Sequence, residues 1–288
     1  MSTDSHDRVL IAGCGKIGTR LGEELASRGA EVWGLRRQSG LLPAALRALT
    51  ADLCEPESLQ AIPARITRVY YLATPNAYTD EAYRMAYVDG LRNLLQVLAD
   101  QRQAPRRVIF VSSTAVYAQH AGEWVDETSP TAPTGFSGQR LLEAEHLLQS
   151  AHLHGLVVRF GGIYGRDRNT MIRKVRAREP CNAAPAFYTN RIHEDDCVGV
   201  LCHLGQLSSP QSVYLAVDDA PCTQCELMDW LAGELGQPKP PRAKDSPRTG
   251  SKRCCNARLK ASGYALRFPT YREGYRAMLA STHGNGAQ

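Results

Sequence analysis

The sequence predicts an α/β fold: a Rossmann-type doubly wound parallel sheet with a smaller C-terminal substrate lobe. Short apolar runs of strand length alternate with segments of helical periodicity through the first half of the chain. A glycine-rich turn follows the first of these runs. The chain has 288 residues, 43% of them hydrophobic and 22% charged, which is enough to form one large sheet and a small additional lobe.

Strands and helices are expected to alternate along the chain. Ile17, Leu21 and Leu25 recur at four-residue spacing after the first apolar run and predict an amphipathic helix. Because strands that alternate with helices build parallel sheets, we expect helices on both faces of the sheet. Strands are expected at 9–12, 31–35, 69–73, 108–112 and 156–160, and further helices at 83–98 and 139–148.

Beyond Gly165 the alternation weakens, which indicates a second part of the chain. We expect a dinucleotide-binding Rossmann domain at 8–165 plus 191–217 and a small substrate-binding lobe at 166–190 plus 218–280. No run approaches the ~18 apolar residues of a membrane span. The apolar run near the N-terminus is also too short for a signal sequence, so we expect a cytoplasmic protein with no membrane partner.

The cysteines predict free thiols and no metal site. Nine cysteines, an odd number, are spread over apolar segments and loops, which is typical of a reducing compartment. Cys222-x-x-Cys225 and the adjacent Cys254 and Cys255 raise the alternative of zinc, but adjacent cysteines share one tetrahedral ion poorly. Thr223–Glu226, ahead of an apolar run, fits a helix capping box instead.

The formal charge of +5 is modest and unevenly distributed. Six basic residues fall within the thirteen positions 166–178, in the expected substrate lobe. A solvated helix face explains them most simply, and a small molecule with a phosphate, bound near Asn169, Thr170 and the basic helix at 173–178, is the next alternative. Nucleic acid is not expected, because no recognisable module is present and no aromatic residues are interleaved with the basic ones.

The glycine-rich turn predicts a dinucleotide site. Gly13, Gly15 and Gly18 form Gly-x-Gly-x-x-Gly in "VLIAGCGKIGTRLGEEL", between a strand and a helix. Gly13 permits the tight turn, Gly15 lets a pyrophosphate approach the backbone, and Gly18 lets helix and strand pack closely. Lys16 and Ile17 are expected to contact the cofactor as well. A turn of this kind without a ligand is the alternative.

The end of the second strand favours NADP over NAD. An NAD site usually has an acidic residue about twenty positions after the turn, on the ribose 2′-hydroxyl. Here "EVWGLRRQ" ends in Arg36 and Arg37, whose guanidinium groups match a 2′-phosphate. A solvated basic turn is the alternative. Further cofactor contacts are expected after the third and fourth strands, at Asp52, Leu53, Ala73, Thr74 and Pro75.

Five stretches carry a resemblance that runs almost from end to end of the chain. In order they are "FVSSTAVYA" (110–118), "VRFGGIYGRDR" (158–168), "RIHEDDCVGVL" (191–201), "VYLAVDDAP" (213–221) and "SKRCCNARLKASGYALRFPTYREG" (251–274). They resemble the extended and atypical short-chain dehydrogenases/reductases, in particular the NAD-dependent epimerase/dehydratase family. Matches in a fixed order are far more specific than any one motif.

The resemblance implies catalytic roles at four positions. The hydroxyl residue after the fifth strand, which contacts the reacting oxygen in the family, corresponds to Ser113, with Thr114 beside it. The family's Tyr-x-x-x-Lys corresponds to Phe136 and Arg140 in "PTGFSGQRLLEAE". For Ser113, a role that only closes the strand is the alternative. Other implied contacts are Phe160, Gly161 and Gly162 for the cofactor, and Tyr78, Tyr117, Tyr164 and Arg191 for the substrate.

Phe136 changes the chemistry that can be expected. A phenyl ring has no proton to give, although Arg140 can still donate to ribose hydroxyls. Reduction of a carbonyl without an acid would lose about 10²- to 10⁴-fold in rate, so a slow or different reaction is implied. Tyr117, Tyr164, Tyr188 and His193 are alternative donors, although such residues are more often packed aromatic groups or hydrogen-bonded histidines.

The sequence therefore predicts an NAD(P)-binding oxidoreductase or an enzyme like a nucleoside-diphosphate-sugar epimerase, with NADP favoured and a small sugar-like or anionic substrate. The alternative is a non-catalytic NADP-sensing regulatory module, which Phe136 supports. A scaffold with a degraded site is less consistent with the intact glycine motif. By resemblance, a homodimer is expected through the helices at 83–98 and 139–148.

Overall fold

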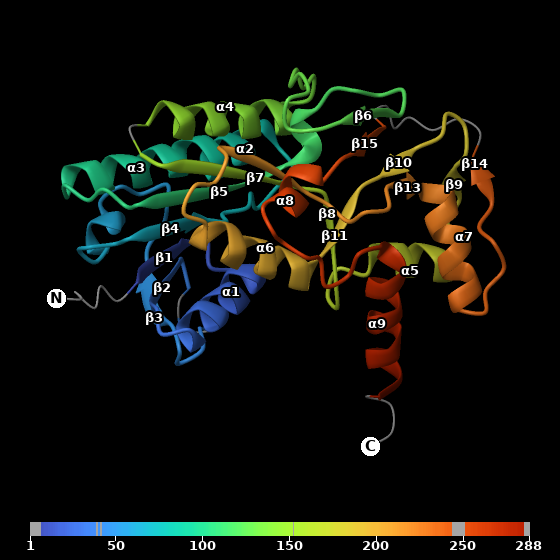
Figure 1. Ribbon diagram of the computed structural model, residues 1–288, viewed down its shortest axis with the longest axis horizontal. Coiled ribbons are helices and arrows are strands. Elements are labelled where there is room, and N and C mark those ends of the chain that lie inside the picture. The colour runs from blue at the N-terminus through green and yellow to red at the C-terminus, as the bar shows by residue number, and fades with distance from the viewer. Residues whose placement is uncertain (1–6, 39, 41, 152, 244–250, 285–288) are drawn as a thin grey trace. The chain divides into compact units, whose positions relative to one another are not determined.

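The protein is built around a seven-stranded sheet in the order β12-β7-β5-β4-β1-β2-β3 (Figure 1). The computed structural model describes residues 7–38, 40, 42–151, 153–243 and 251–284. The strand pairs β1–β2, β1–β4, β2–β3 and β4–β5 are parallel. The strands are β1 (Arg8–Ala12), β2 (Glu31–Arg36), β3 (Arg47–Thr50), β4 (Arg68–Tyr71), β5 (Arg107–Ser113), β7 (Gly155–Phe160) and β12 (Val213–Ala216). The predicted doubly wound α/β fold is confirmed.

The strand order reverses at β1, which defines where a ligand is expected. From β1 the chain builds β2 and β3 on one side and then returns to place β4, β5 and β7 on the other. In such sheets ligands bind outside the carboxyl ends of the strands at this switch point. The glycine-rich turn follows β1, and the segment with Ala73 follows β4, so both lie at that edge.

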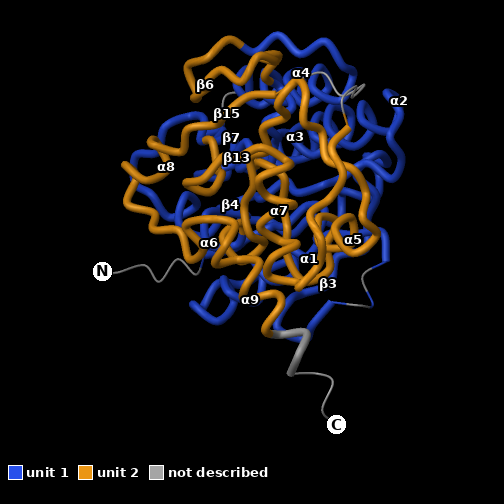
Figure 2. The backbone as a smooth tube through the Cα atoms, turned by 90° about the vertical axis from the view of Figure 1, so that its right-hand side faces the viewer, with its two compact units in different colours: residues 1–116, 131–159, 198–214 blue, residues 117–130, 160–197, 215–288 orange. Residues whose placement is uncertain are grey.

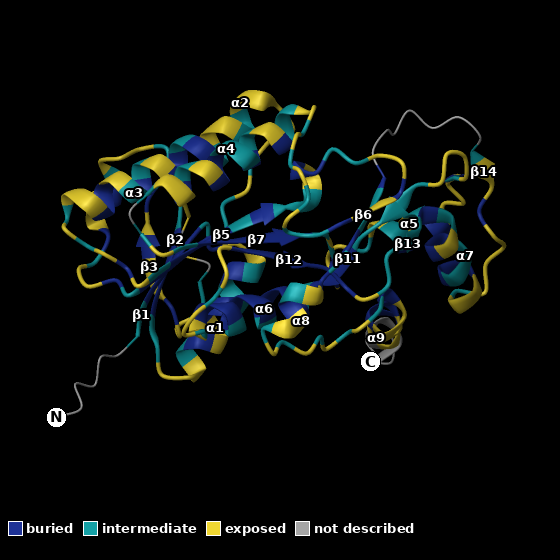
Figure 3. Cartoon of the chain, turned by 45° about the horizontal axis from the view of Figure 1, so that its top comes forward, coloured by how far each residue is buried: buried dark blue, intermediate teal, exposed yellow. Residues whose placement is uncertain are grey.

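Amphipathic helices cover both faces of the sheet. Helices α3 (Gly90–Asp100) and α4 (Phe136–Ser150) lie on one face, and α1 (Lys16–Ser27) and α6 (Glu194–Gln206) on the other (Figure 1). Figure 3 shows the buried strands between helices whose outer faces are exposed. In α1, Leu21 and Leu25 are buried, as their four-residue spacing predicts.

The chain divides into two compact units, which Figure 2 colours blue and orange. Unit 1 comprises 1–116, 131–159 and 198–214, and unit 2 comprises 117–130, 160–197 and 215–288. No helix in the described part of the chain is long and apolar enough to cross a membrane. The remaining elements assigned to unit 2 are β6 (Glu123–Val125), β8 (Gly162–Tyr164), α5 (Thr170–Arg176), β9 (Cys181–Asn182), β10 (Tyr188–Thr189), β11 (Arg191–His193), β13 (Cys222–Thr223), α7 (Gln224–Glu234), β14 (Arg242–Ala243), β15 (Lys252–Cys254), α8 (Ala257–Ala261) and α9 (Tyr271–Gly284).

The helix expected at 83–98 is interrupted by a wide turn. Helix α2 (Asp80–Tyr83) passes into a π-helical segment, η3 (Arg84–Asp89), before α3 begins. The hydroxyl of Tyr71, from β4, donates to the carbonyl of Ala86 at 2.6 Å. A polar side chain that inserts into the helical hydrogen-bond ladder widens it. The sequence pattern did not predict this change of pitch.

A buried polar network fixes α4 to the sheet. Ser112 of β5 donates through Oγ to Glu145 Oε1 at 2.6 Å, and Arg159 of β7 donates to Glu145 through Nε at 3.0 Å and Nη2 at 2.6 Å. The three residues are 3%, 1% and 5% exposed. A charge at this depth is tolerated only when it is paired and hydrogen-bonded.

We predict that Glu145→Ala lowers the free energy of unfolding by about 3–5 kcal/mol, because the Arg159 guanidinium stays buried without this carboxylate. Urea unfolding measures the loss. The control is Glu24→Ala, which removes an exposed ion pair with Arg28 and should cost less than about 1 kcal/mol. Equal small losses in the two variants would contradict the role of the network.

Candidate functional site

The glycine-rich turn is held at the switch point by close backbone contacts. Gly13 has φ +83°, and a Cβ there would come within 2.4 Å of the Ala73 nitrogen, so no other residue fits without displacing the backbone. The amides of Gly13 and Cys14 donate to the Leu35 carbonyl at 3.1 and 3.0 Å. The turn thus joins the ends of β1, β2 and β4.

The start of α1 fits a pyrophosphate. Gly15 is the N-cap and makes no side-chain cap, and a Cβ on it would meet nothing within 4 Å. The first-turn N–H groups of a helix lack partners inside the helix, and its N-terminus attracts anions. A Cβ on Gly18 would lie 3.0 Å from Ile11 Cγ2, which explains the third glycine by helix–strand packing. These residues fit a dinucleotide.

Arg36 and Arg37 lie at the end of β2, beside the glycine-rich turn. Arg36 is half-buried and Arg37 is exposed. The Ala51 amide donates to the Arg36 carbonyl at 3.4 Å, which brings the end of β3 alongside. Asp52 Oδ1 accepts from the Cys54 amide at 2.9 Å and so stabilises its own turn, while Leu53 is buried.

Ser113 and Phe136 lie on neighbouring segments of unit 1. Ser113 ends β5, and its Oγ accepts from the Ala115 amide at 3.2 Å. Thr114 begins the short helix η4 (Thr114–Val116). A Cβ on Gly138 would come within 2.4 Å of the Ala115 carbonyl oxygen, so the first turn of α4, which begins at Phe136, packs directly on η4.

The guanidinium group of Arg140 forms hydrogen bonds with two carboxylates. Its Nε and Nη2 donate to the two carboxylate oxygens of Asp80 at 2.8 and 2.9 Å, and its Nη1 donates to Glu143 at 2.8 Å. Hydrogen bonds to Asp80 and then Glu143 raise the pKa of Arg140, and the reciprocal bond from Arg140 lowers the pKa of Asp80. The expected ribose contact of Arg140 stays a prediction, and it would have to use its remaining N–H groups.

Three of the expected cofactor residues belong to unit 2. Phe160 is buried, and the amides of Gly161 and Gly162 donate to the carbonyls of Ala216 at 3.2 Å and Asn190 at 2.8 Å. A Cβ on Gly161 would lie 2.8 Å from the Asn190 oxygen, so close strand packing explains this glycine. A cofactor role for the three residues stays a prediction.

Tyr117 and Tyr164 are both packed inside unit 2. The Tyr117 hydroxyl donates to the Asp126 carbonyl at 2.8 Å. Tyr164 stacks on Tyr275 with ring centroids 4.5 Å apart, and burial raises its pKa far above that of free tyrosine. A hydroxyl so reluctant to ionise is a poor proton donor at neutral pH.

Arg191 is buried among groups of its own unit. Its guanidinium donates to Thr189 Oγ1 and lies 3.0 Å from Cys222 Sγ and 4.9 Å from the ring centre of Tyr271. Burial raises the pKa of nearby Asp218 to about 7, although the Arg191 charge opposes this shift. Contact of Arg191 with a substrate anion stays a prediction.

The basic residues of 166–178 lie mostly on the exposed side of α5 and its flanks. Arg173 and Arg176 are exposed, whereas Ile172 and Val175 of the same helix are buried. Lys174 pairs with Glu179 at 2.5 Å. This arrangement matches the solvated helix face that the sequence favoured, and a phosphate ligand there stays a prediction.

Comparison with known families decides the membership of the chain. Residues 9–198, which include the glycine-rich turn, Ser113 and Phe136, match the model of the NAD dependent epimerase/dehydratase family. The chain belongs to this family. The resemblance inferred from the sequence motifs is therefore confirmed, and the protein is a member of a family of NAD(P)-binding enzymes.

Two relatives of this chain cover nearly its whole length. A Methylobacillus flagellatus structure assigned as an NAD-dependent epimerase/dehydratase is 38% identical, with TM-score 0.82, over 97% of this chain and 100% of that one. A Streptomyces protein named 3-diazoavenalumate denitrifying reductase is 28% identical over 93% of this chain and 98% of its own. Thermus thermophilus UDP-glucose 4-epimerase, solved with NAD, is 20% identical, with TM-score 0.79 over 98% and 100%, a likeness that bears on the fold alone.

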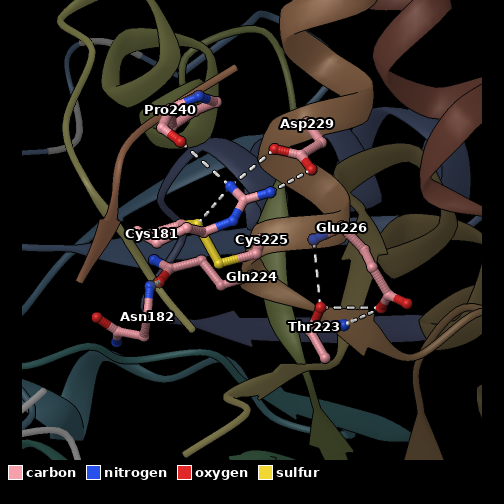
Figure 4. The surroundings of a disulfide bond; sticks show 9 residues. Cys181, Asn182, Thr223, Gln224, Cys225, Glu226, Asp229 and Pro240 are labelled. Carbon is pink, nitrogen blue, oxygen red and sulfur yellow. Dashed lines mark hydrogen bonds and ion pairs between the residues drawn. A yellow bond between two sulfur atoms is a disulfide. The ribbon is translucent and has the colours of Figure 1, made fainter. Parts of the chain in front are cut away.

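The expectation of free thiols is wrong for two cysteines of the chain. Cys181 of β9 and Cys225 of α7 form a disulfide across a sequence separation of 44 (Figure 4). The fold brings their Cα atoms to within 5.2 Å of each other, a proximity that the spacing along the chain could not reveal.

The expected capping box is confirmed, since the side chains of Thr223 and Glu226 each accept a hydrogen bond from the other residue's backbone amide. Among the described residues no group of three or more His, Cys, Asp or Glu could hold a metal.

We predict that Cys181→Ser/Cys225→Ser lowers the free energy of unfolding by about 4 kcal/mol, because the disulfide closes a long loop and restricts the unfolded chain. Urea unfolding with and without dithiothreitol measures it. The reductant should destabilise the wild type but not the double variant. Cys255→Ser, which alters a half-buried cysteine outside the disulfide, is the control. A wild type that does not respond to reductant would contradict the prediction.

The sequence interpretation missed Asp80 and Tyr83 of this family member. Asp80 is separated by 60 residues from Arg140, and the ring of Tyr83 lies edge-on to Phe136 at 5.3 Å. Tyr78, Tyr83 and Tyr87 recur at intervals of five and four residues. That spacing was the available signal for an aromatic cluster near the expected acid position.

Proposed function

We propose that this protein is an NADP(H)-dependent reductase. The observation that carries the proposal is the pair Arg36 and Arg37 beside a glycine-rich turn whose backbone fits a pyrophosphate. NADPH, when bound, would supply a hydride. The turn would hold the pyrophosphate through N–H groups, and the two guanidinium groups would bind the 2′-phosphate.

Reduction fits the site better than epimerisation. An epimerase of this type must remove a proton from a substrate hydroxyl and return it, which requires an acid/base residue at position 136. Phe136 cannot do this. Ser113 could still donate a hydrogen bond to a substrate oxygen or nitrogen, since its Oγ acts as the acceptor in its bond with Ala115.

The absence of an acid at this position favours substrates that accept a hydride without a proton. When a hydride attaches to a diazonium carbon, N₂ leaves with the electron pair of the C–N bond, so the charges balance without a proton. The Streptomyces relative is named as a denitrifying reductase of a diazo compound. We extend that substrate class to this chain as part of the proposal.

The first test is coenzyme binding. We predict that NADP and NADPH bind more tightly than NAD and NADH, and that Arg36→Ala/Arg37→Ala weakens the phosphorylated forms by about 10- to 100-fold, because charged hydrogen bonds to the phosphate are lost. Isothermal titration calorimetry measures this. Arg92→Ala, which removes an exposed arginine of α3, should leave binding unchanged. A wild type that binds none of the four would refute the proposal.

The second test restores the missing acid. We predict that Phe136→Tyr gives weak NADPH-dependent reduction of aldehydes and ketones, and that Phe136→Tyr/Asp80→Asn gives more, because releasing Arg140 from Asp80 lets its charge lower the pKa of the new tyrosine. Loss of NADPH absorbance measures both. Reduction of diazonium compounds should not need the hydroxyl of the new tyrosine. This reaction is assayed below neutral pH, because diazonium ions form azo compounds with ionised tyrosine side chains.

Phe136→Leu is the control for the loss of ring packing alone. A non-catalytic NADP sensor would bind NADPH but reduce neither substrate class in any variant. That outcome would favour the regulatory alternative, whereas wild-type activity on diazonium compounds would exclude it.

A further inference from the structure

Three aromatic rings meet at the position of the missing acid. Phe136 lies 4.9 Å from the ring centre of Tyr78 and 5.3 Å from that of Tyr83, and the two tyrosine rings are 5.6 Å apart. We call these three residues the aromatic platform. They come from α4, from α2 and from the loop before α2, all within unit 1.

The platform rests on the sheet. Tyr87 lies 5.5 Å from Tyr83 and 6.1 Å from Phe110, measured between ring centres, and Phe110 is fully buried in β5. The π-helical segment η3 carries Tyr87, so the wide turn lies within this line of rings. Edge-to-face contacts of this kind favour definite ring orientations. The platform is therefore fixed in position by the core.

A bidentate ion pair braces the two helices that hold the platform. Figures 1 and 3 show α2 beside α4. The Asp80 carboxylate of α2 and the Arg140 guanidinium of α4 form two parallel hydrogen bonds of 2.8 and 2.9 Å. Such fork-like pairs fix geometry as well as charge. Asp80 is two residues from Tyr78 in sequence, and Arg140 is one helical turn from Phe136.

The ring of Tyr78 is exposed to solvent, although its contacts with Phe136 and Tyr83 hold it in place. Tyr78 is 73% exposed, the largest value among the exposed large hydrophobic residues of the described chain, and Trp124 and then Met85 follow. Burial raises the pKa of Tyr83, and it raises that of Tyr87 to about 12, so both remain neutral at physiological pH. The platform thus offers uncharged aromatic surface to a ligand.

We propose that the aromatic platform binds the planar aromatic ring of the substrate. The inference rests on the proposed reductase, because Phe136 occupies the position of the acid, next to the reacting atoms in related enzymes. The segment with Ala73, Thr74 and Pro75 leads directly to Tyr78, so the platform continues from the expected cofactor contacts. A flat conjugated ring gains offset or edge-to-face contacts here that a saturated ring cannot make.

Titration calorimetry with two carboxylates tests the platform, with and without saturating NADP. trans-Cinnamate carries a planar ring and 3-cyclohexylpropanoate a saturated one of similar size. We expect the wild type to bind cinnamate at least about fivefold more tightly, Tyr78→Ala to weaken it about five- to tenfold, and Tyr78→Phe to retain it. Trp124→Ala, at an exposed aromatic residue outside the platform, should change nothing.

Three results would overturn the inference: no binding of cinnamate, equal binding of the two carboxylates, or an unchanged affinity in Tyr78→Ala. Light scattering on the same samples tests whether a second copy of the chain binds the platform instead. If Tyr78→Ala converts a dimer to monomers and cinnamate does not bind, the platform is a contact between two copies of the chain. Tyr78-dependent binding of cinnamate without any binding of NADP would support the platform and refute the proposed coenzyme.

Discussion

The candidate site depends most on the buried hydrogen bonds that the Glu145 carboxylate accepts. This carboxylate is almost fully buried, and it joins α4 to two strands at once through Ser112 and Arg159. Because α4 is fixed at this point, its first turn, which begins at Phe136, packs on η4, the segment that follows Ser113. Loss of this charge would disturb the position of the site as well as stability.

The two residues expected at the family's Tyr-x-x-x-Lys positions both have matched partners. Phe136 is packed by two tyrosine rings, and Arg140 is matched by Asp80 in a bidentate pair. If the site had merely decayed, we would expect an unpaired cation or a poorly packed ring, because nothing would maintain the neighbours. The matched partners agree with the proposed function, in which the site works without a tyrosine acid. The same pairing explains why a tyrosine placed at 136 alone would lack its usual cationic neighbour.

Local patterns predicted the fold and the glycine-rich turn because their causes are local. The strands follow from apolar runs, and Gly13 is required by a positive φ angle and a close approach to Ala73. The features that escaped prediction join distant segments. Nothing in the expected helix at 139–148 singled out Glu145 as a buried charge, and Cys225 looked like half of a CxxC pair until the fold placed Cys181 beside it. The line of rings through Tyr87 depends on a wide helical turn that a side chain from β4 stabilises.

A phenyl ring and a tyrosine at position 136 differ in whether the side chain can donate a proton. A tyrosine acts as an acid when a nearby cation lowers its pKa, and here Asp80 holds that cation. A hydroxyl pressed against Tyr78 and Tyr83 would itself lose hydration without a charged partner, which raises its pKa, as burial raises that of Tyr83. Under these conditions a hydroxyl would contribute little to proton transfer and would interrupt an apolar contact. A phenyl ring keeps the shape of the site and the aromatic surface, and it suits the proposed hydride transfer, which would be complete without a proton.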